Sequence, residues 1–182
     1  MRLSEALIQK FAAHDDPSFF IAAYPNKETK KKIKKYQEDM DSKGATETTP
    51  PDEYHNTIRF VKRKDWKDGK DEELAKALDN ITDKLKEIGN ITCKPTAIEN
   101  LGDKDALVIK LESDEMDKAF DCIDSAMRAV GCPPSQYPKY IQHMTLFYDV
   151  KAEGKEKPDF DLVFDEIVLQ DNEEKVLWKV KL

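Results

Sequence analysis

A six-residue pattern that occurs twice constrains the fold of this chain more than any other feature. Residues 55–60 read HNTIRF and residues 143–148 read HMTLFY, so each has His, Thr two positions later, then a branched aliphatic and finally an aromatic residue. Successive side chains of a β-strand point to opposite faces of the sheet. Two strands are therefore expected, each with His and Thr on one face and its aliphatic and aromatic residues in the core. If the strands lie near each other, two imidazoles and two hydroxyls meet in one cleft.

Short strands and amphipathic helices alternate along the rest of the chain. Apolar runs bounded by Gly, Pro and Asn predict strands, and apolar residues at helical spacing predict helices. The expected strands cover residues 18–24, 55–62, 91–100, 106–112, 139–149, 161–169 and 175–181, and the expected helices cover residues 1–16, 27–40, 71–89 and 115–130. This order predicts an α+β protein in which antiparallel or mixed sheet is covered by helices on the outside.

The length of the chain predicts one main domain. Residues 1–16 are expected to form an N-terminal helical extension, and residues 17–182 a single domain of ordinary size. The sequence contains neither the Gly-rich dinucleotide-binding pattern nor the P-loop pattern, so nucleotide chemistry of those two kinds is not expected.

His55 and His143 are the candidate catalytic residues. Histidine titrates near about pH 6.5, so one ring can accept a proton while the other, protonated, donates one. Phosphodiester cleavage without a metal needs such a pair: one imidazole activates the attacking hydroxyl or water, and the other protonates the leaving oxygen. Thr57 and Thr145 can donate hydrogen bonds to the non-bridging phosphate oxygens. The roles of base and acid stay open between the two histidines.

Other interpretations of these histidines stay open at this point. Either His55 or His143 alone could be structural, and a threonine in a strand is ordinary. Zinc binding is disfavoured because no convincing third ligand accompanies the two histidines, so no metal and no cofactor are expected. The third histidine, His14, lies near the end of an expected helix and is interpreted as a surface residue.

Composition limits the partners and the compartment. With 30 Lys and Arg against 37 Asp and Glu, the net charge is −7, which disfavours binding along duplex nucleic acid. No apolar run approaches the roughly 20 residues that span a bilayer, and no signal peptide is evident. The Lys-rich residues 30–35 are interpreted as a solvated helix face. Cys93, Cys122 and Cys132 show no disulfide framework or metal pattern, so a cytoplasmic protein with free thiols is expected. A monomer is favoured.

At its two motifs the chain resembles the 2H phosphoesterase superfamily, which is named for paired motifs of His, any residue, Ser or Thr, and a hydrophobic residue. Residues 55–58 (HNTI) and 143–146 (HMTL) both fit, and the resemblance covers about residues 18–182. It implies a bilobal α+β fold in which two pseudo-symmetric sheets line a central cleft. It also implies metal-free activity on 2′,3′-cyclic phosphates, 2′–5′ linkages or other short and cyclic nucleotides.

Within that superfamily the chain looks most like the phage anti-CBASS nucleases, which degrade cyclic oligonucleotide immune signals. The residues that carry this likeness are FIAAY at 20–24 and the extended second motif HMTLFYD at 143–149. The resemblance implies that Tyr24 belongs to the substrate-binding site, and that a chain of phage origin acts in the host cytoplasm. It also implies an acidic residue of the C-terminal hairpin at the cleft, for which the candidates are Glu166, Glu173 and Glu174.

Further residues near the motifs are candidates for substrate binding. Arg59 lies two residues beyond Thr57, where a regular strand would place it on the same face and within reach of phosphate. Phe147 or Trp66 could stack on a nucleobase. The basic run at residues 62–64 could raise the local potential for an anion. A structural role is the alternative for Arg59 and for Trp66, and a solvated turn is the alternative for the basic run.

The sequence thus predicts a metal-independent phosphodiesterase that hydrolyses small cyclic or 2′–5′/3′–5′ linked nucleotides. A phage enzyme that degrades cyclic oligonucleotide immune signals is the favoured case. One alternative is a 2′,3′-cyclic phosphodiesterase that processes RNA. Another is a non-catalytic nucleotide-binding module, but binding alone does not need two titratable imidazoles.

Overall fold

The computed structural model describes residues 18–40, 42–66, 70–102, 105–135, 139–171 and 175–182. The expected helix over residues 1–16 lies outside these ranges. The strands are β1 (Ser18–Pro25), β2 (Glu47–Thr48), β3 (Asn56–Lys62), β4 (Ile91–Leu101), β5 (Ala106–Glu112), β6 (His143–Tyr148), β7 (Leu162–Asp171) and β8 (Val176–Lys181). The helices are α2 (Lys27–Asp39), α3 (Asp71–Asp79), α4 (Thr82–Ile88) and α5 (Asp114–Ala129), with short 3-10 turns η1 (Pro51–Glu53) and η2 (Arg63–Asp65).

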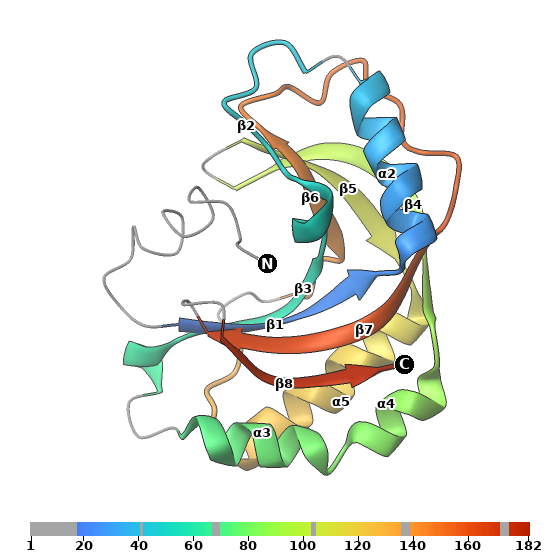
Figure 1. Ribbon diagram of the computed structural model, residues 1–182. Helices are drawn as coiled ribbons and strands as arrows, with labels where there is room; N and C mark the ends of the chain where they lie inside the picture. The colour runs from blue at the N-terminus through green and yellow to red at the C-terminus, as the bar shows by residue number, and fades with distance from the viewer. Residues whose placement is uncertain (1–17, 41, 67–69, 103–104, 136–138, 172–174) are drawn as a thin grey trace.

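The strands form two halves that share β4. Their order is β2-β6-β5-β4-β7-β1-β3, β8 pairs with β7, and every pairing in the described part of the chain is antiparallel. Residues 91–93 of β4 pair with β7, whereas residues 94–101 pair with β5. One half contains β3, β1, β7 and β8, and the other contains β2, β6 and β5 (Figure 1). The predicted bilobal α+β fold is confirmed, and each half carries one His-x-Thr motif.

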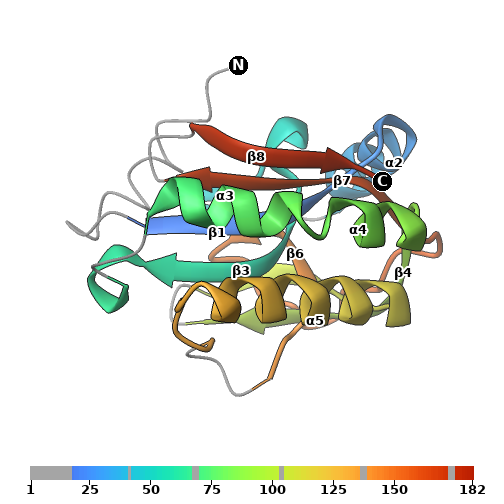
Figure 2. The same ribbon diagram turned by 90° about the horizontal axis from the view of Figure 1, so that it is seen from below.

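Three helices cover one face of the first half (Figure 2). Helices α3 and α4 contact both α5 and β8, and α5 contacts β3 and β4. The residues of β1 that point toward this layer are Phe19, Ile21 and Ala23, all of which belong to the hydrophobic core. Strand alternation therefore turns Phe20, Ala22 and Tyr24 toward the opposite face, on the side of the cleft.

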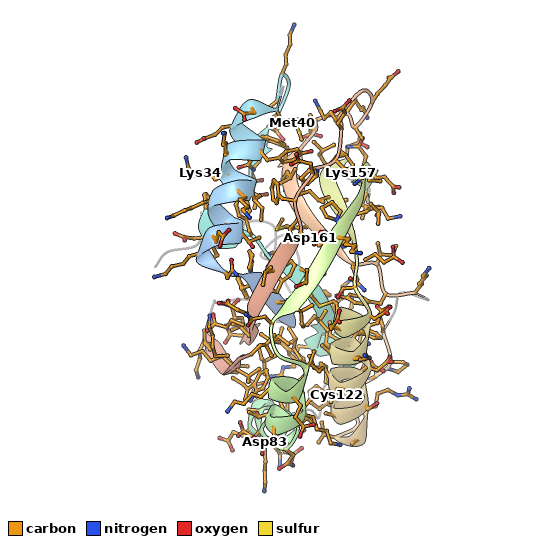
Figure 3. The ribbon with its side chains drawn as sticks, turned by 90° about the vertical axis from the view of Figure 1, so that its right-hand side faces the viewer. Lys34, Met40, Asp83, Cys122, Lys157 and Asp161 are labelled. Carbon is orange, nitrogen blue, oxygen red and sulfur yellow. The ribbon has the colours of Figure 1, made fainter. Side chains whose placement is uncertain are left out.

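The expected helix over residues 27–40 is α2. Its first turn is capped by Asn26, whose side chain accepts a hydrogen bond from Thr29 N at 2.8 Å. The interpretation of the lysine run as a solvated face agrees with the structure: Lys34 lies on the outer side of α2 (Figure 3), where it pairs with Glu38. The inner side of α2 buries Ile33 and Gln37.

The prediction of one continuous helix over residues 71–89 is wrong, because two helices, α3 and α4, occupy this segment. The backbone tightens between them: Ile81 N bonds to Leu78 O, three residues back, before Leu85 N resumes the four-residue spacing with Ile81 O. Leu74, Leu78 and Leu85 are all buried. The apolar stripe therefore runs across the break, and periodicity alone does not reveal it.

Each motif strand contains a β-bulge directly after its threonine. Along β3, Thr57 pairs with Ala22 but Arg59 pairs with Ile21, so Ile58 is an extra residue. Along β6, Thr145 pairs with Val108 but Phe147 pairs with Leu107, so Leu146 is the extra residue. One extra residue reverses the direction of every side chain that follows it.

The bulges correct the predicted orientation of the motif residues. The residues after Ile58 and Leu146 turn into the protein, whereas the closing aromatics, Phe60 and Tyr148, return to the face that carries His and Thr. Phe60 pairs directly with Phe20, which lies on the cleft face of β1. The closing aromatic residues thus do not join the core, contrary to the prediction for regular strands.

Candidate active site

His55 lies immediately before β3, with its ring enclosed by two aromatic side chains of β1. The ring centroids of Phe20 and Tyr24 are 5.8 Å and 5.9 Å from that of His55. Nδ1 of His55 lies 2.7 Å from Glu53 O, a main-chain carbonyl of η1. A carbonyl only accepts hydrogen bonds, so Nδ1 carries the proton of the neutral ring, and Nε2 is the atom left for proton transfer.

His143 is the first residue of β6 and repeats this arrangement. Its Nδ1 lies 2.8 Å from Ile141 O, again a main-chain carbonyl two residues earlier. The same tautomer follows, with the proton on Nδ1 and the lone pair on Nε2. The two halves of the fold therefore present their imidazoles in the same way, although Glu53 and Ile141 have nothing in common as side chains.

Burial sets the charge state of both imidazoles. Desolvation lowers the pKa of His55 and that of His143 below the usual value for histidine, because a buried imidazolium loses its hydration. The charge of His143 lowers the pKa of His55 further. This effect between like charges acts over short range, and β3 contacts β6, so His55 and His143 lie near each other where the two halves meet.

Thr57 and Thr145 accompany the histidines on the same face of their strands. Thr57 pairs with Ala22, which lies between Phe20 and Tyr24 on the cleft face of β1. Thr145 follows His143 by two residues, ahead of the Leu146 bulge, and strand alternation therefore gives it the same face. Both threonines are half-buried. Thr57 and Thr145 thus lie on the strand faces that carry His55 and His143.

Tyr24 forms the edge of the site next to His55. Its hydroxyl donates a 2.6 Å hydrogen bond to Gln170 Oε1 of β7. Burial raises the pKa of Tyr24, and the nearby carboxylates of Glu166 and Glu53 raise it further, so the phenol keeps its proton. Glu166 pairs with Tyr24 across the sheet and shares its face. Of the three acidic candidates in the C-terminal hairpin, Glu166 thus faces this side, while Glu173 and Glu174 lie outside the described residues.

A cavity of about 1030 Å³ opens beside Tyr24. Tyr24 and Glu53 both line it. The Tyr24 ring also contacts the His55 ring, and the main-chain oxygen of Glu53 bonds to His55 Nδ1. The cavity is bordered by the end of β1, the start of α2, η1, β7 and β8, with Val168 and Val176 as apolar lining and Lys179 as a basic one. Neither imidazole is among the residues that line this cavity, which adjoins the His55 side of the site through Tyr24 and Glu53.

The prediction that Arg59 binds substrate is wrong. The Ile58 bulge turns Arg59 inward, where it is 2% exposed and pairs with Asp124 of α5 at 3.0 Å. Its Nη2 also donates to Pro133 O at 2.7 Å. These contacts give Arg59 a structural role that joins β3 to α5 and to the segment before β6.

Phe147 and Trp66 do not offer a ring face to a nucleobase either. The bulge at Leu146 turns Phe147 into the hydrophobic core, with 2% of it exposed. Trp66 is buried against Phe19, with ring centroids 5.7 Å apart. In the basic run at 62–64, Arg63 pairs with Asp71 and stacks over the Phe19 ring, so at least this residue has a packing role.

The sequence did not single out several residues that the structure places at the site. Phe20 contacts the His55 ring, and Gln170 accepts the hydrogen bond of Tyr24. On the other half, Lys110 of β5 pairs with His143 and shares its face, where it is 3.4 Å from Glu99. The strand that contains Lys110 was predicted. Its position opposite His143, however, depends on the register between β5 and β6, which a single sequence does not reveal.

No three His, Cys, Asp or Glu side chains in the described ranges are arranged to hold a metal ion. None of the helices of the described residues is both long and apolar enough to cross a bilayer. The three cysteines are free thiols, as predicted: Cys93 and Cys132 are buried, and Cys122 lies half-buried on α5 (Figure 3).

Paired His-x-Thr motifs on the two halves of an antiparallel α+β fold define a 2H phosphoesterase. The family described as "Anti-CBASS protein Acb1" matches residues 17–177, and the chain belongs to that family. No curated protein matches the chain by sequence. The family identifies the chain as a phosphodiesterase that degrades signalling nucleotides.

Solved structures share the fold at low sequence identity. Apo LigT of E. coli aligns with a TM-score of 0.59 at 15% identity, over 86% of this chain and 88% of that chain. TT0787 of Thermus thermophilus aligns with a TM-score of 0.61 at 16% identity, over 91% of this chain and 97% of that chain. The MHV ns2 PDE domain aligns with a TM-score of 0.57 at 18% identity, over 85% and 99%.

Proposed function

We propose that the protein hydrolyses a phosphodiester bond of a small cyclic or 2′–5′/3′–5′ linked nucleotide, with His55 and His143 as its acid–base pair and no metal ion. The observation that carries this proposal is the matching hydrogen bond of each Nδ1 to a main-chain carbonyl, which presents both Nε2 atoms for proton transfer. Two interacting imidazoles titrate in two steps, and at a pH between these steps one ring is neutral and the other is protonated.

The chemical step needs only these two rings and water. The neutral Nε2 takes a proton from the attacking water as its oxygen bonds to phosphorus. The protonated Nε2 of the other ring gives its proton to the leaving oxygen as the bond between phosphorus and that oxygen breaks. The rings end with their protonation states exchanged, and proton transfer with solvent restores the starting state.

Thr57 and Thr145 serve as phosphate-binding residues in this proposal. Each lies two residues from a catalytic imidazole on the same strand face, and neither hydroxyl has a hydrogen-bond partner among the described residues. A hydroxyl in this position donates to a non-bridging oxygen and stabilises the charge that develops in the transition state.

The cavity beside Tyr24 is suited to the nucleoside next to the scissile phosphate. Its volume of about 1030 Å³ is in the range of small-molecule sites, and it combines the Tyr24 ring with apolar Val168 and Val176. Glu166 provides a carboxylate that can accept hydrogen bonds from a base or a ribose. E. coli LigT, which shares the fold, has been solved with 3′-AMP, ATP and NADP⁺, all small nucleotides.

A panel of substrates tests the proposal. The wild-type protein is incubated with cyclic dinucleotides, cyclic trinucleotides, 2′–5′ oligoadenylate and RNA ending in a 2′,3′-cyclic phosphate, with and without EDTA. Linear or shortened products that form equally well in EDTA support it. Binding without cleavage of any of these would favour a nucleotide-binding module, and cleavage that EDTA abolishes would favour a metal-dependent reaction.

A further inference from the structure

Tyr140 and Asn56 connect the two motifs through a hydrogen bond inside the protein. Asn56 follows His55 directly and is fully buried in β3. The Tyr140 hydroxyl donates to Asn56 Oδ1 at 3.1 Å. Tyr140 in turn precedes Ile141, whose carbonyl oxygen is the acceptor for Nδ1 of His143. One hydrogen bond therefore links Asn56, the neighbour of His55, to Tyr140. Tyr140 is the neighbour of Ile141, whose carbonyl orients the ring of His143.

The ring of Tyr140 is held firmly enough to transmit this constraint. It stacks on Phe120 of α5, with ring centroids 4.5 Å apart and an angle of 7° between the planes. Burial raises the pKa of Tyr140, so the hydroxyl keeps the proton that it donates. A ring fixed by stacking on one side and by a hydrogen bond at its tip has little freedom to move.

A second contact holds the same segment against β3. Arg59, the next inward-facing residue of β3 beyond the bulge, donates to Pro133 O at 2.7 Å. Asn56 and Arg59 thus attach the chain between α5 and β6 at two points. The Arg59 contact is distant from His143 along the chain, whereas the Tyr140 contact lies three residues before it, so Tyr140 controls the position of that imidazole more directly.

We propose that Tyr140 is a positioning residue: its hydrogen bond to Asn56 sets the placement of the His143 imidazole relative to His55. This inference rests on the proposed acid–base function of the two histidines. Proton transfer through two rings requires both Nε2 atoms to reach one phosphate, and a misplacement of about 1 Å can lower a rate by about 100-fold. Tyr140 itself does not touch the substrate.

The decisive variant is Tyr140→Phe, which keeps the ring and its stacking on Phe120 but removes the hydroxyl. Its matched control is Tyr36→Phe, since Tyr36 also donates one hydrogen bond, to Glu156 O at 2.6 Å, from the outer helix α2. We expect kcat of Tyr140→Phe to fall about 10- to 100-fold while KM changes less than about threefold. Tyr36→Phe should keep the wild-type kcat, and the two variants should have similar melting temperatures.

A readout without substrate separates this inference from the proposed function. In protein labelled with ¹³C-histidine, the Cε1–Hε1 NMR signals of His55 and His143 should shift in Tyr140→Phe and stay in place in Tyr36→Phe. Unchanged signals together with unchanged kcat would overturn the positioning role. If the wild type cleaves none of the nucleotides, the proposed function fails, and the NMR signals still decide whether Tyr140 positions the imidazoles.

A double variant tests whether Tyr140 acts through Asn56. Asn56→Leu removes the acceptor, so adding Tyr140→Phe to it should lower kcat no further. The proposal is contradicted if Tyr140→Phe lowers kcat by the same factor in the Asn56→Leu background as in the wild type. That result would show that the hydroxyl acts independently of Asn56. The result for the single variant Tyr140→Phe stands even if Asn56→Leu folds poorly.

Discussion

Ile58 and Leu146 occupy equivalent places in the two halves of the fold, because each is the extra residue of a β-bulge directly after a motif threonine. The bulge gives the motif a geometry that a regular strand lacks. His, Thr and the closing aromatic residue share one face, whereas the residue between His and Thr and the two residues between Thr and the aromatic turn inward. The pseudo-symmetry of the site thus extends from the side chains to an irregularity of the backbone.

Replacing either histidine of the proposed acid–base pair should remove activity without unfolding the protein. We expect His55→Ala and His143→Ala each to lower kcat by at least about 100-fold, because one partner of the proton transfer is lost. Thermal unfolding followed by circular dichroism checks that the fold is kept. His14→Ala is the control, since His14 lacks a threonine two residues later, and it should retain full activity. Full activity in the His55 and His143 variants would rule out the acid–base pair.

The motif threonines should matter for the rate through their hydroxyls. Thr57→Val and Thr145→Val keep the shape and the β-branching but lose the donor, and a lost donor to a developing charge lowers kcat by about 100-fold. Thr92→Val, at an exposed position of β4, is the matched control and should leave kcat unchanged. Steady-state kinetics on all three variants decide the question, and equal kcat values across them would contradict a role for the hydroxyls.

The lowered pKa values of both imidazoles predict an acid-shifted optimum. In the free enzyme the reactive state has one protonated and one neutral ring, and it is most populated between the two pKa values. Because burial moves both below about 6.5, kcat/KM should peak on the acid side of that pH and fall as the remaining proton is lost at higher pH.

Substrate should shift this profile in the opposite direction. An anionic phosphate favours the protonated imidazole and raises its pKa, so the optimum of kcat should lie at higher pH than that of kcat/KM. Rates measured from about pH 4 to pH 9 separate the two profiles. A kcat/KM optimum well above neutrality would contradict the desolvation of the rings.

Arg59 should contribute to stability and not to substrate binding. Arg59→Ala leaves the partly buried carboxylate of Asp124 without its main partner, which should lower the free energy of unfolding by about 3 kcal/mol. Urea denaturation measures this loss. Lys32→Ala, which removes an exposed pair with Glu28, should leave the free energy of unfolding nearly unchanged. An Arg59 variant of normal stability but greatly raised KM would restore the phosphate-binding interpretation.

The sequence predicted the elements of this fold better than their irregularities. Caps such as Asn26 and the alternation of apolar residues are local signals, and within the described residues each predicted strand has a counterpart in the structure, as do the predicted helices over 27–40 and 115–130. The two-residue strand β2 was missed because it is held by pairing with β6 inside a Pro- and Thr-rich segment. The break between α3 and α4 was missed because the apolar stripe continues across it.

Next to the motifs, the direction predicted for two side chains was wrong. Alternation assumes a regular ladder, so it put Arg59 and Phe147 in the cleft, and nothing in a single sequence marks the bulges at Ile58 and Leu146. The partner that makes a buried Arg59 acceptable, Asp124, lies on α5 and becomes adjacent only in the folded protein. Long-range contacts of this kind decide side-chain direction without leaving a local pattern.

The main-chain acceptors of the two imidazoles have a consequence for how the family can diverge. If a side-chain carboxylate were the acceptor, a single substitution would remove it, and protonation at low pH would weaken its hydrogen bond to Nδ1. A peptide carbonyl is present at every residue and its direction depends only on the backbone path, so the hydrogen bond to Nδ1 does not require a particular side chain at position 53 or 141. Glu53 in one half and Ile141 in the other show this freedom within one molecule. The backbone path before each histidine therefore sets the orientation of its imidazole, whatever side chains the neighbouring residues carry.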